Sequence, residues 1–286
     1  MVMQLTDTRH GNGPLLVCQP GGPGMHPGYL EPLADLAAHH TVALVHPRGT
    51  GDSPRPSDRG AYSLEEYADD LSAWIEREAN GEPVDLLGHS HGGAVASLVA
   101  ARDPRLVRSL VLLGTPAYGG DEAEDMAEAF QRARLSEPEV AEALAVLGAQ
   151  GEEYPPDDAA LGRLIAAVIP LWVGPMSART RSWQSHLARR PANIDALRYF
   201  NESVFPSLEE EMSHLGKVAC PTLAIGGELD GWAGPDHLGR LTQAIQDCRT
   251  EVIPGSGHMC HVDATQTVVT LVDKFLQESR AHENLM

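Results

Sequence analysis

Residues 88–92 read Gly-His-Ser-His-Gly, a G-x-S-x-G pattern that could hold a serine nucleophile. A short apolar run over residues 84–87 precedes the pattern, and an Ala/Val-rich run over residues 93–101 follows it. This context predicts a strand that enters, a helix that leaves and a sharp turn with Ser90 at its apex. Because a serine hydroxyl is a poor nucleophile by itself, the chain must also supply a base, an acid and oxyanion-binding N–H groups.

Two later segments supply a candidate acid and a candidate base. Asp230 follows an apolar strand pattern at residues 222–225, and His258 follows another at residues 250–253. The carboxyl ends of parallel strands meet at one edge of an open sheet, so we expect Ser90, Asp230 and His258 to converge there. Glu228 is an alternative acid, because on an extended segment it would share the face of Asp230.

The oxyanion-binding groups are expected from two glycine-rich turns. One N–H belongs to His91, the residue after the proposed nucleophile, at the start of the predicted helix. The second is expected at Gly22, in the loop over residues 19–24 that follows an earlier apolar strand at residues 15–18. Glycine at that position lets the main chain approach a substrate closely.

These motifs together resemble the α/β-hydrolase superfamily and, within it, the prolyl iminopeptidase-like group. The group carries H-G-G-P-G at the oxyanion loop, where this chain has P-G-G-P-G at residues 20–24, and D-x-R-G-x-G-x-S, where this chain has H-P-R-G-T-G-D-S at residues 46–53. The departures from the group are Pro20, His46, His91 in place of a common Trp, and Gly231, where some aminopeptidase members place an acid that holds a substrate ammonium.

The resemblance implies a serine hydrolase that works through an acyl-enzyme, most simply an aminopeptidase-like amidase of the proline iminopeptidase type. Its substrate would be a peptide or an aminoacylated small metabolite. We expect the following residues to bind the substrate, the two acids holding its ammonium: Asp195, Glu202, Tyr199, Phe200 and Trp232. Two alternatives stay open: a carboxylesterase or lactonase for small apolar esters, and a catalytically silent hydrolase fold that serves as a ligand receptor.

Composition limits the partners. The chain has 286 residues and a formal net charge of −19, which argues against binding to nucleic acid or to anionic membrane surfaces. The N-terminus lacks the apolar stretch of a signal peptide, and no run is long and apolar enough to span a bilayer. The four scattered cysteines are expected to be reduced thiols of a cytoplasmic protein. No metal and no cofactor is expected, and the sequence does not indicate the oligomeric state.

The order of elements predicts an α/β fold with a mostly parallel twisted sheet flanked by helices. We expect the core to comprise residues 1–117 and 215–286, with residues 118–214 inserted as a helical cap, because the strand–helix alternation stops there. Only about a dozen residues precede Pro14, so the N-terminal edge of the sheet should be shortened to one strand. A helix is expected at residues 63–80, opened by a capping box of Ser63 and Glu66.

Overall fold

The computed structural model of the protein describes residues 1–151 and 153–283. Its centre is a seven-stranded sheet in the order β1-β3-β2-β4-β5-β6-β7. Strand β1 pairs antiparallel with β3, and all other neighbours are parallel. The strands are β1 Thr6–His10, β2 Leu15–Gln19, β3 Thr41–His46, β4 Val84–His89, β5 Val107–Leu113, β6 Thr222–Gly227 and β7 Cys248–Ile253. A mostly parallel sheet with one strand at the N-terminal edge is what the sequence predicts.

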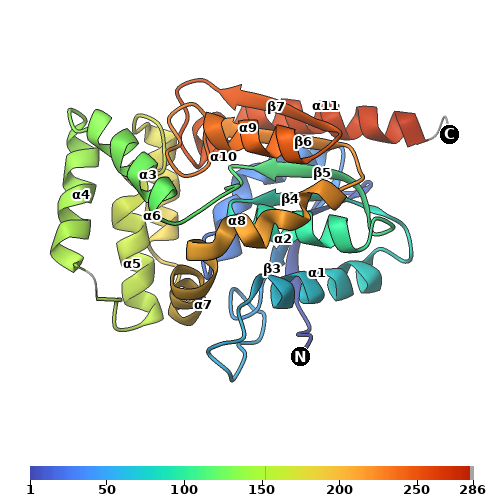
Figure 1. The fold of residues 1–286 in the computed structure, drawn as a ribbon, viewed down its shortest axis with the longest axis horizontal. Coiled ribbons are helices and arrows are strands. Elements are labelled where there is room, and N and C mark those ends of the chain that lie inside the picture. Colours follow the sequence, from blue (N-terminus) through green and yellow to red (C-terminus); the bar gives the residue numbers. More distant parts are fainter. Residues whose placement is uncertain (152, 284–286) are drawn as a thin grey trace.

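Helices cover both faces of this sheet (Figure 1). One face packs against α1 (Leu64–Glu78), α2 (His91–Arg102), α9 (Pro235–Ala244) and the 3-10 segment η5 (Met212–Lys217). The other face packs against the 3-10 helix η1 (Pro27–Ala38), α10 (Cys260–Asp263) and α11 (Thr265–Glu283). Residues of one strand alternate between the two cores, as Leu16 and Val17 of β2 do, because successive side chains of a strand point to opposite faces.

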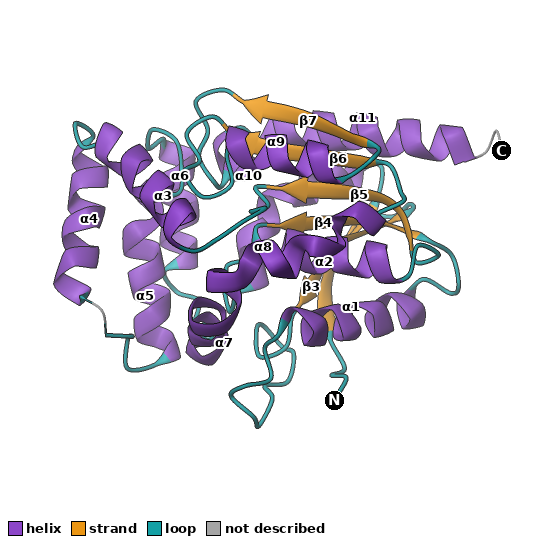
Figure 2. Ribbon diagram, in the orientation of Figure 1, coloured by secondary structure: helices purple, strands orange, loops and turns teal. Residues whose placement is uncertain are grey.

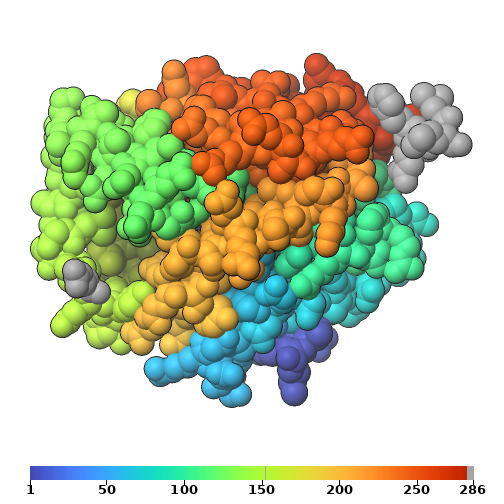
Figure 3. Space-filling view, in the orientation of Figure 1, coloured from blue at the N-terminus to red at the C-terminus, as the bar shows by residue number. Residues whose placement is uncertain are grey.

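Most of the chain between β5 and β6 is helical and lies beyond the carboxyl ends of the parallel strands (Figure 2), whereas its last segment, η5, packs on one face of the sheet. Its α-helices are α3 Asp121–Ala133, α4 Pro138–Gln150, α5 Asp158–Val168, α6 Ala178–Leu187, α7 Ile194–Tyr199 and α8 Leu208–Glu211. Shorter segments are η2 Ile169–Leu171, the π-helical η3 Phe200–Val204 and η4 Phe205–Ser207. The space-filling view shows a hollow between the green helices of this region and its orange segment after α7 (Figure 3). The predicted division at residues 118 and 214 stays a prediction.

Helix α1 begins as its sequence predicts. The Ser63 hydroxyl accepts the Glu66 N–H, and the Glu66 carboxylate accepts the Ser63 N–H, so two otherwise unpaired donors of the first turn are satisfied. Tyr67 and Trp74 lie on its buried face. The capping box thus fixes where the helix starts, and its apolar stripe fixes which face meets the sheet.

The loop after β3 contains both the Arg48 motif and the unusual His46. The Arg48 guanidinium is fully buried and donates to the Asp70 carboxylate of α1 at 2.7 Å. The His46 ring accepts the Asp52 N–H at Nδ1 and contacts the Thr8 hydroxyl of β1 at Nε2. His46 therefore connects the edge strand to this loop, which fits a scaffold position rather than one that contacts substrate.

Within the described part of the chain, no helix is long and apolar enough to cross a membrane. All four cysteines are free thiols. Burial raises the pKa of the Cys18 thiol to about 12, so this side chain packs as a small neutral group.

Candidate active site

The turn between β4 and α2 holds Ser90 in a strained conformation. Its φ of 55° and ψ of −129° are rare for a residue with a side chain. A Cβ on Gly88 would collide with the main chain of Gly92 and Gly93, and a Cβ on Gly92 would collide with the carbonyl groups of Gln19 and Pro20. Glycine is required at these positions because the main chains of the strand, the helix and the loop after β2 are in direct contact and leave no space for a Cβ.

Ser90, His258 and Asp230 form one hydrogen-bonded chain at the carboxyl ends of β4, β7 and β6. The His258 Nε2 atom lies 3.0 Å from the Ser90 hydroxyl oxygen, and its Nδ1 atom lies 2.8 Å from Asp230 Oδ2. A carboxylate oxygen accepts the Nδ1–H, which leaves Nε2 free to accept the serine proton. The arrangement matches the nucleophile, base and acid of an acyl-transfer triad.

The surroundings of Asp230 hold its carboxylate in place. The side chain is fully buried, and its Oδ1 atom accepts the N–H groups of Trp232 and Ala233 at 2.8 and 3.0 Å. Each oxygen therefore has a donor, and Oδ2 remains directed at the imidazole. A carboxylate fixed in this way orients the histidine ring and stabilises its protonated form.

Glu228 has a different environment. It is exposed, and its carboxylate accepts the Gly255 N–H at 2.8 Å. It thus connects the loops after β6 and β7 without contacting His258. Of the two acids that the sequence left open, the geometry places Asp230 against the imidazole.

The main-chain groups predicted to bind an oxyanion lie beside Ser90. Gly22 has a φ of 51°, and His91 is the first residue of α2; both line the cavity above the serine. A Cβ on Gly21 would collide with the Ser90 side chain and the His91 nitrogen, so the loop after β2 rests directly on the turn. Their roles as oxyanion donors remain a prediction, and their location is consistent with it.

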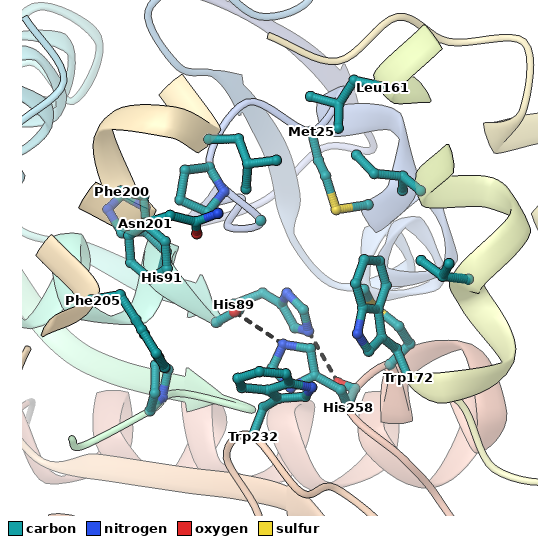
Figure 4. A pocket seen from close by; sticks show the side chains of 18 of the residues that line it. Met25, His89, His91, Leu161, Trp172, Phe200, Asn201, Phe205, Trp232 and His258 are labelled. Carbon is teal, nitrogen blue, oxygen red and sulfur yellow. Dashed lines mark hydrogen bonds between the residues drawn. The ribbon is translucent and has the colours of Figure 1, made fainter. Parts of the chain in front are cut away.

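A cavity of about 450 Å³ opens above Ser90, between the core and the helices that follow β5. Figure 4 shows two walls: Met25, Leu161 and Trp172 on one side, and His91, Phe200, Asn201 and Phe205 on the other. His258 and Trp232 lie between them, and His258 is hydrogen-bonded to Ser90. The cavity is also lined by Gly22, Pro23, His89, Pro116, Glu124, Leu147, Leu164, Ile165, Val168, Leu197 and Met259.

Two of the five predicted substrate-binding residues, Phe200 and Trp232, line this cavity. Asp195, Glu202 and Tyr199 are not among its lining residues, and their binding of substrate stays a prediction.

These three residues have other surroundings. The Asp195 carboxylate pairs with Arg55 at 2.7 Å and with Arg59 at 3.6 Å on the outer surface. Glu202 is exposed, and Tyr199 packs against the core. The ion pairs of Asp195 hold it away from the serine.

Sequence reasoning missed Glu124 of α3 and Asn201 of η3, the side chains that add a carboxylate and an amide to the cavity lining. Both are exposed, and neither side chain has a hydrogen-bonding or ionic partner among the described residues. Glu124 lies in an acidic stretch over residues 121–128 that reads as a solvated helix face, so no local signal distinguished it.

Several buried histidines near the site are held neutral. Burial lowers the pKa of His91 to about 4 and that of His261 to about 3. His237, stacked on Tyr118, has its pKa lowered to about 4, mainly by burial. These rings pack as uncharged groups around the Ser90 turn and the Asp230 loop.

Comparison with known proteins agrees with this geometry. The family described as "alpha/beta hydrolase fold" matches residues 14–150. The 2-(acetamidomethylene)succinate hydrolase of Mesorhizobium japonicum is 26% identical over 93% of this chain and 89% of its own length. The proline iminopeptidase of Heyndrickxia coagulans is 23% identical over 96% of this chain and 93% of its own. The crystal structure of the enol-lactonase from Burkholderia xenovorans LB400 has a TM-score of 0.69 at 21% identity, covering 96% of this chain and 97% of that one.

The seven-stranded sheet and the family match over residues 14–150 show that the chain has the α/β-hydrolase fold, and its curated relatives support a hydrolase. Within the superfamily it is similar to the proline iminopeptidases, as its glycine-rich motifs indicated. Relatives with other hydrolase names are equally similar, so the comparisons leave its substrate open.

The two candidate acids can be separated by isosteric amides. Asp230→Asn should lower kcat by about 10⁴-fold, because an amide favours the wrong tautomer of His258. Glu228→Gln should lower kcat only a few-fold, since that side chain contacts the Gly255 N–H instead. The measurement is kcat of both variants on one ester substrate. Equal losses, or a larger loss in the Glu228 variant, would assign the acid to Glu228.

The neutral histidines predict a dependence of stability on pH. An unfolded histidine takes up a proton near pH 6.5, whereas His91 and His237 do so only near pH 4 in the folded protein. The unfolded state therefore binds more protons in this window, so the free energy of unfolding is fully retained above pH 6.5 and falls as the pH drops toward 4.

The expected loss is on the order of a few kcal/mol per histidine, measured by urea unfolding at several pH values. His237→Asn is the matched variant, because its amide oxygen can still accept the Ala117 N–H while it no longer titrates. Its stability should fall less steeply over the same window. A slope equal to that of the unaltered protein would contradict the assignment of His237.

Proposed function

We propose that this protein is a serine hydrolase that cleaves an ester or amide carbonyl through an acyl-enzyme. The observation that carries the proposal is the continuous chain from Ser90 through His258 to buried Asp230, at the floor of a cavity large enough for a small substrate. Strained main chain at the serine supports it, because strain of this kind gathers at functional sites.

In the proposed cycle, His258 takes the Ser90 proton as the hydroxyl oxygen attacks the substrate carbonyl. Asp230 holds the imidazole in the required tautomer and stabilises the imidazolium. The N–H groups of Gly22 and His91 bind the tetrahedral oxyanion, at about 3 kcal/mol of transition-state stabilisation for each donor. His258 then protonates the leaving group, and a water molecule activated by the same ring hydrolyses the acyl-enzyme.

We infer that the substrate presents apolar groups to the cavity, as a carboxylesterase substrate does. Among the described residues, both walls consist almost entirely of aliphatic and aromatic side chains, so a buried ammonium would meet no buried carboxylate from them. An unpaired charge in such surroundings is very costly. This favours an uncharged acyl group over the free α-amine that the resemblance implies.

An aminopeptidase-like amidase is the second candidate, and Glu124 is the observation in its favour. Its carboxylate is exposed, has no partner among the described residues and belongs to the cavity lining, as the Asn201 amide does. Similarity to proline iminopeptidases supports the same candidate. An ammonium held by Glu124 would remain near solvent, where its desolvation is small.

The nucleophile is tested by Ser90→Ala. The variant should fold normally and lose all but a small residual rate, because only binding and the oxyanion donors remain. A fluorophosphonate probe should label the unaltered protein and not the variant. Labelling that persists in the variant, or activity within a few-fold of normal, would reject Ser90 as the nucleophile. An unaltered protein that neither reacts with the probe nor turns over any ester would instead be a ligand receptor.

The substrate class is tested with three matched compounds: an aryl ester of an aliphatic acid, an aminoacyl arylamide, and the same arylamide with its amine acetylated. Apolar recognition predicts that the aliphatic ester has the highest kcat/KM and that Glu124→Gln changes it little. A preference for the free amine, lost both on acetylation and in Glu124→Gln, would establish the aminopeptidase activity instead. Glu122→Gln is the control, because this neighbouring acid pairs with Arg240 and does not line the cavity.

A further inference from the structure

A chain of hydrogen bonds runs beneath the candidate site through two side chains that the proposed cycle does not use. The Gly21 N–H donates to the Tyr29 hydroxyl oxygen at 2.7 Å. That oxygen lies 2.8 Å from His89 Nδ1, and His89 Nε2 lies 3.1 Å from the main-chain carbonyl oxygen of His258. Tyr29 and His89 are both 1% exposed, so water does not compete for these bonds.

The partners fix where every proton lies. The His258 carbonyl oxygen can only accept, so His89 Nε2 must carry a proton. Burial and the neighbouring histidines His261 and His258 lower the pKa of His89 well below its usual value, so the ring is neutral and has no second proton. Nδ1 therefore accepts, and the Tyr29 hydroxyl donates to it while accepting from Gly21. All the donors point one way, from the oxyanion loop toward the base.

This chain touches three parts of the proposed machinery, one at each end and one in between. Gly21 precedes Gly22, the predicted oxyanion donor. His89 precedes Ser90, and the final acceptor is the main chain of His258. No other part of the molecule joins all three through side chains within the described residues, although the same loops also touch through main chain.

We propose that Tyr29 and His89 are positioning residues, which fix the positions of the oxyanion loop, the nucleophile turn and the loop of the base relative to one another. The proposal rests on the proposed function of Ser90 and His258. Bonds in a dry interior polarise one another and resist bending, so two side chains can fix three loops. A misplacement of about 1 Å at a reacting group can cost on the order of 100-fold in rate, and this is the error that the chain prevents.

The first experiment reads the proton positions without any turnover. In protein labelled with ¹⁵N-histidine, two-bond ¹H–¹⁵N spectra distinguish the two neutral tautomers, and the His89 signals are assigned by their loss in His89→Asn. We expect His89 to be the Nε2–H tautomer and to stay neutral down to the lowest pH at which the protein remains folded. An Nδ1–H tautomer, or a ring that titrates near pH 6.5, would overturn the proposal.

The second experiment removes one atom. Tyr29→Phe keeps the ring and its packing on His89 and His261 but leaves the Gly21 N–H and His89 Nδ1 without partners. We expect kcat to fall on the order of 100-fold with KM unchanged, because the cavity lining is unaltered while the reacting groups shift relative to one another. An unchanged kcat in the folded variant would overturn the proposal.

The third experiment removes the hydrogen bonds of His89 Nδ1 and Nε2 one at a time. In His89→Asn the amide oxygen can take the place of Nδ1 and still accept from Tyr29, but no donor reaches the His258 carbonyl. In His89→Gln the amide nitrogen can take the place of Nε2 and still donate to that carbonyl, but Tyr29 loses its acceptor. Tyr29→Phe and His89→Gln thus remove the same bond, so the double variant should be no slower than the slower single variant. Additive losses would show that the two residues act separately and would overturn the proposal.

His261→Gln is the matched control. His261 lies in the same buried cluster, 4.9 Å from the His89 ring, but its Nε2 atom faces the main-chain carbonyl of Tyr29 at 3.3 Å, outside the chain. We expect this variant to lower the melting temperature and to leave kcat close to normal. Its small effect on kcat should add to that of Tyr29→Phe. A loss of kcat as large as that of Tyr29→Phe would show that any disturbance of this core has the same effect.

The two proposals fail in different ways. If Ser90→Ala retains activity, the proposed nucleophile is wrong, whereas the tautomer of His89 is unaffected. If the tautomer is Nδ1–H while Ser90→Ala is inactive, the hydrolase mechanism stands and the positioning role is rejected.

Discussion

The close main-chain contact between the Ser90 turn and the loop after β2 is the constraint on which the rest of the site depends. The turn is possible only because Gly88 and Gly92 leave room for strand, helix and loop to touch, and because Gly93 leaves room for the Thr115 side chain. Ser90 itself has a side chain and a positive φ, a combination that costs on the order of 1–3 kcal/mol and persists only where the surroundings fix it. Ser90 lines the cavity at this turn, and the same contact brings Gly22 and His91 to the cavity lining beside it.

A second set of main-chain contacts connects the cavity-forming region to the loop of the base. The Met259 N–H donates to the Trp172 carbonyl oxygen at 2.9 Å. One Asp263 carboxylate oxygen accepts both the Gly174 and the Gly257 N–H groups, at 2.8 and 2.9 Å. The segment after η2 therefore shares its hydrogen bonds with residues on both sides of His258. Movement of this wall of the cavity would disturb the base directly, whereas the opposite wall around Asn201 has no such bond to the His258 loop among the described residues.

Much of this architecture could be predicted from the sequence because its signals are local. Apolar runs ending in glycine-rich turns indicated the strands and the residues at their carboxyl ends, and the sheet brings Ser90, Asp230 and His258 together within hydrogen-bonding distance. The capping box of α1 fixed a helix start in the same way. Each of these features depends on a few neighbouring residues with specific geometric needs, so a pattern can reveal it.

The cavity walls could not be predicted in this way, because they depend on how distant helices pack. Asp195 was expected beside the substrate, but Arg55, from another part of the chain, holds it on the outer surface. Tyr29 carried no motif at all, and its importance appears only when Gly21 and His89 are seen on either side of its hydroxyl. Long-range partners of this kind leave no periodicity and no spacing to recognise.

The distribution of charge explains why the Asp230–His258 pair dominates the electrostatics of the site. The chain carries a formal net charge of −19, yet among the described residues that line the cavity the only carboxylate is Glu124, which is exposed. The rings nearest the triad, His89, His91 and His261, are neutral because burial lowers the pKa of each. In these dry surroundings a second charge would act strongly on any imidazolium at His258, since interactions strengthen as the local dielectric falls. Its absence leaves buried Asp230 as the carboxylate that acts on His258 at contact distance, and it leaves polar recognition of a substrate to the exposed part of the lining.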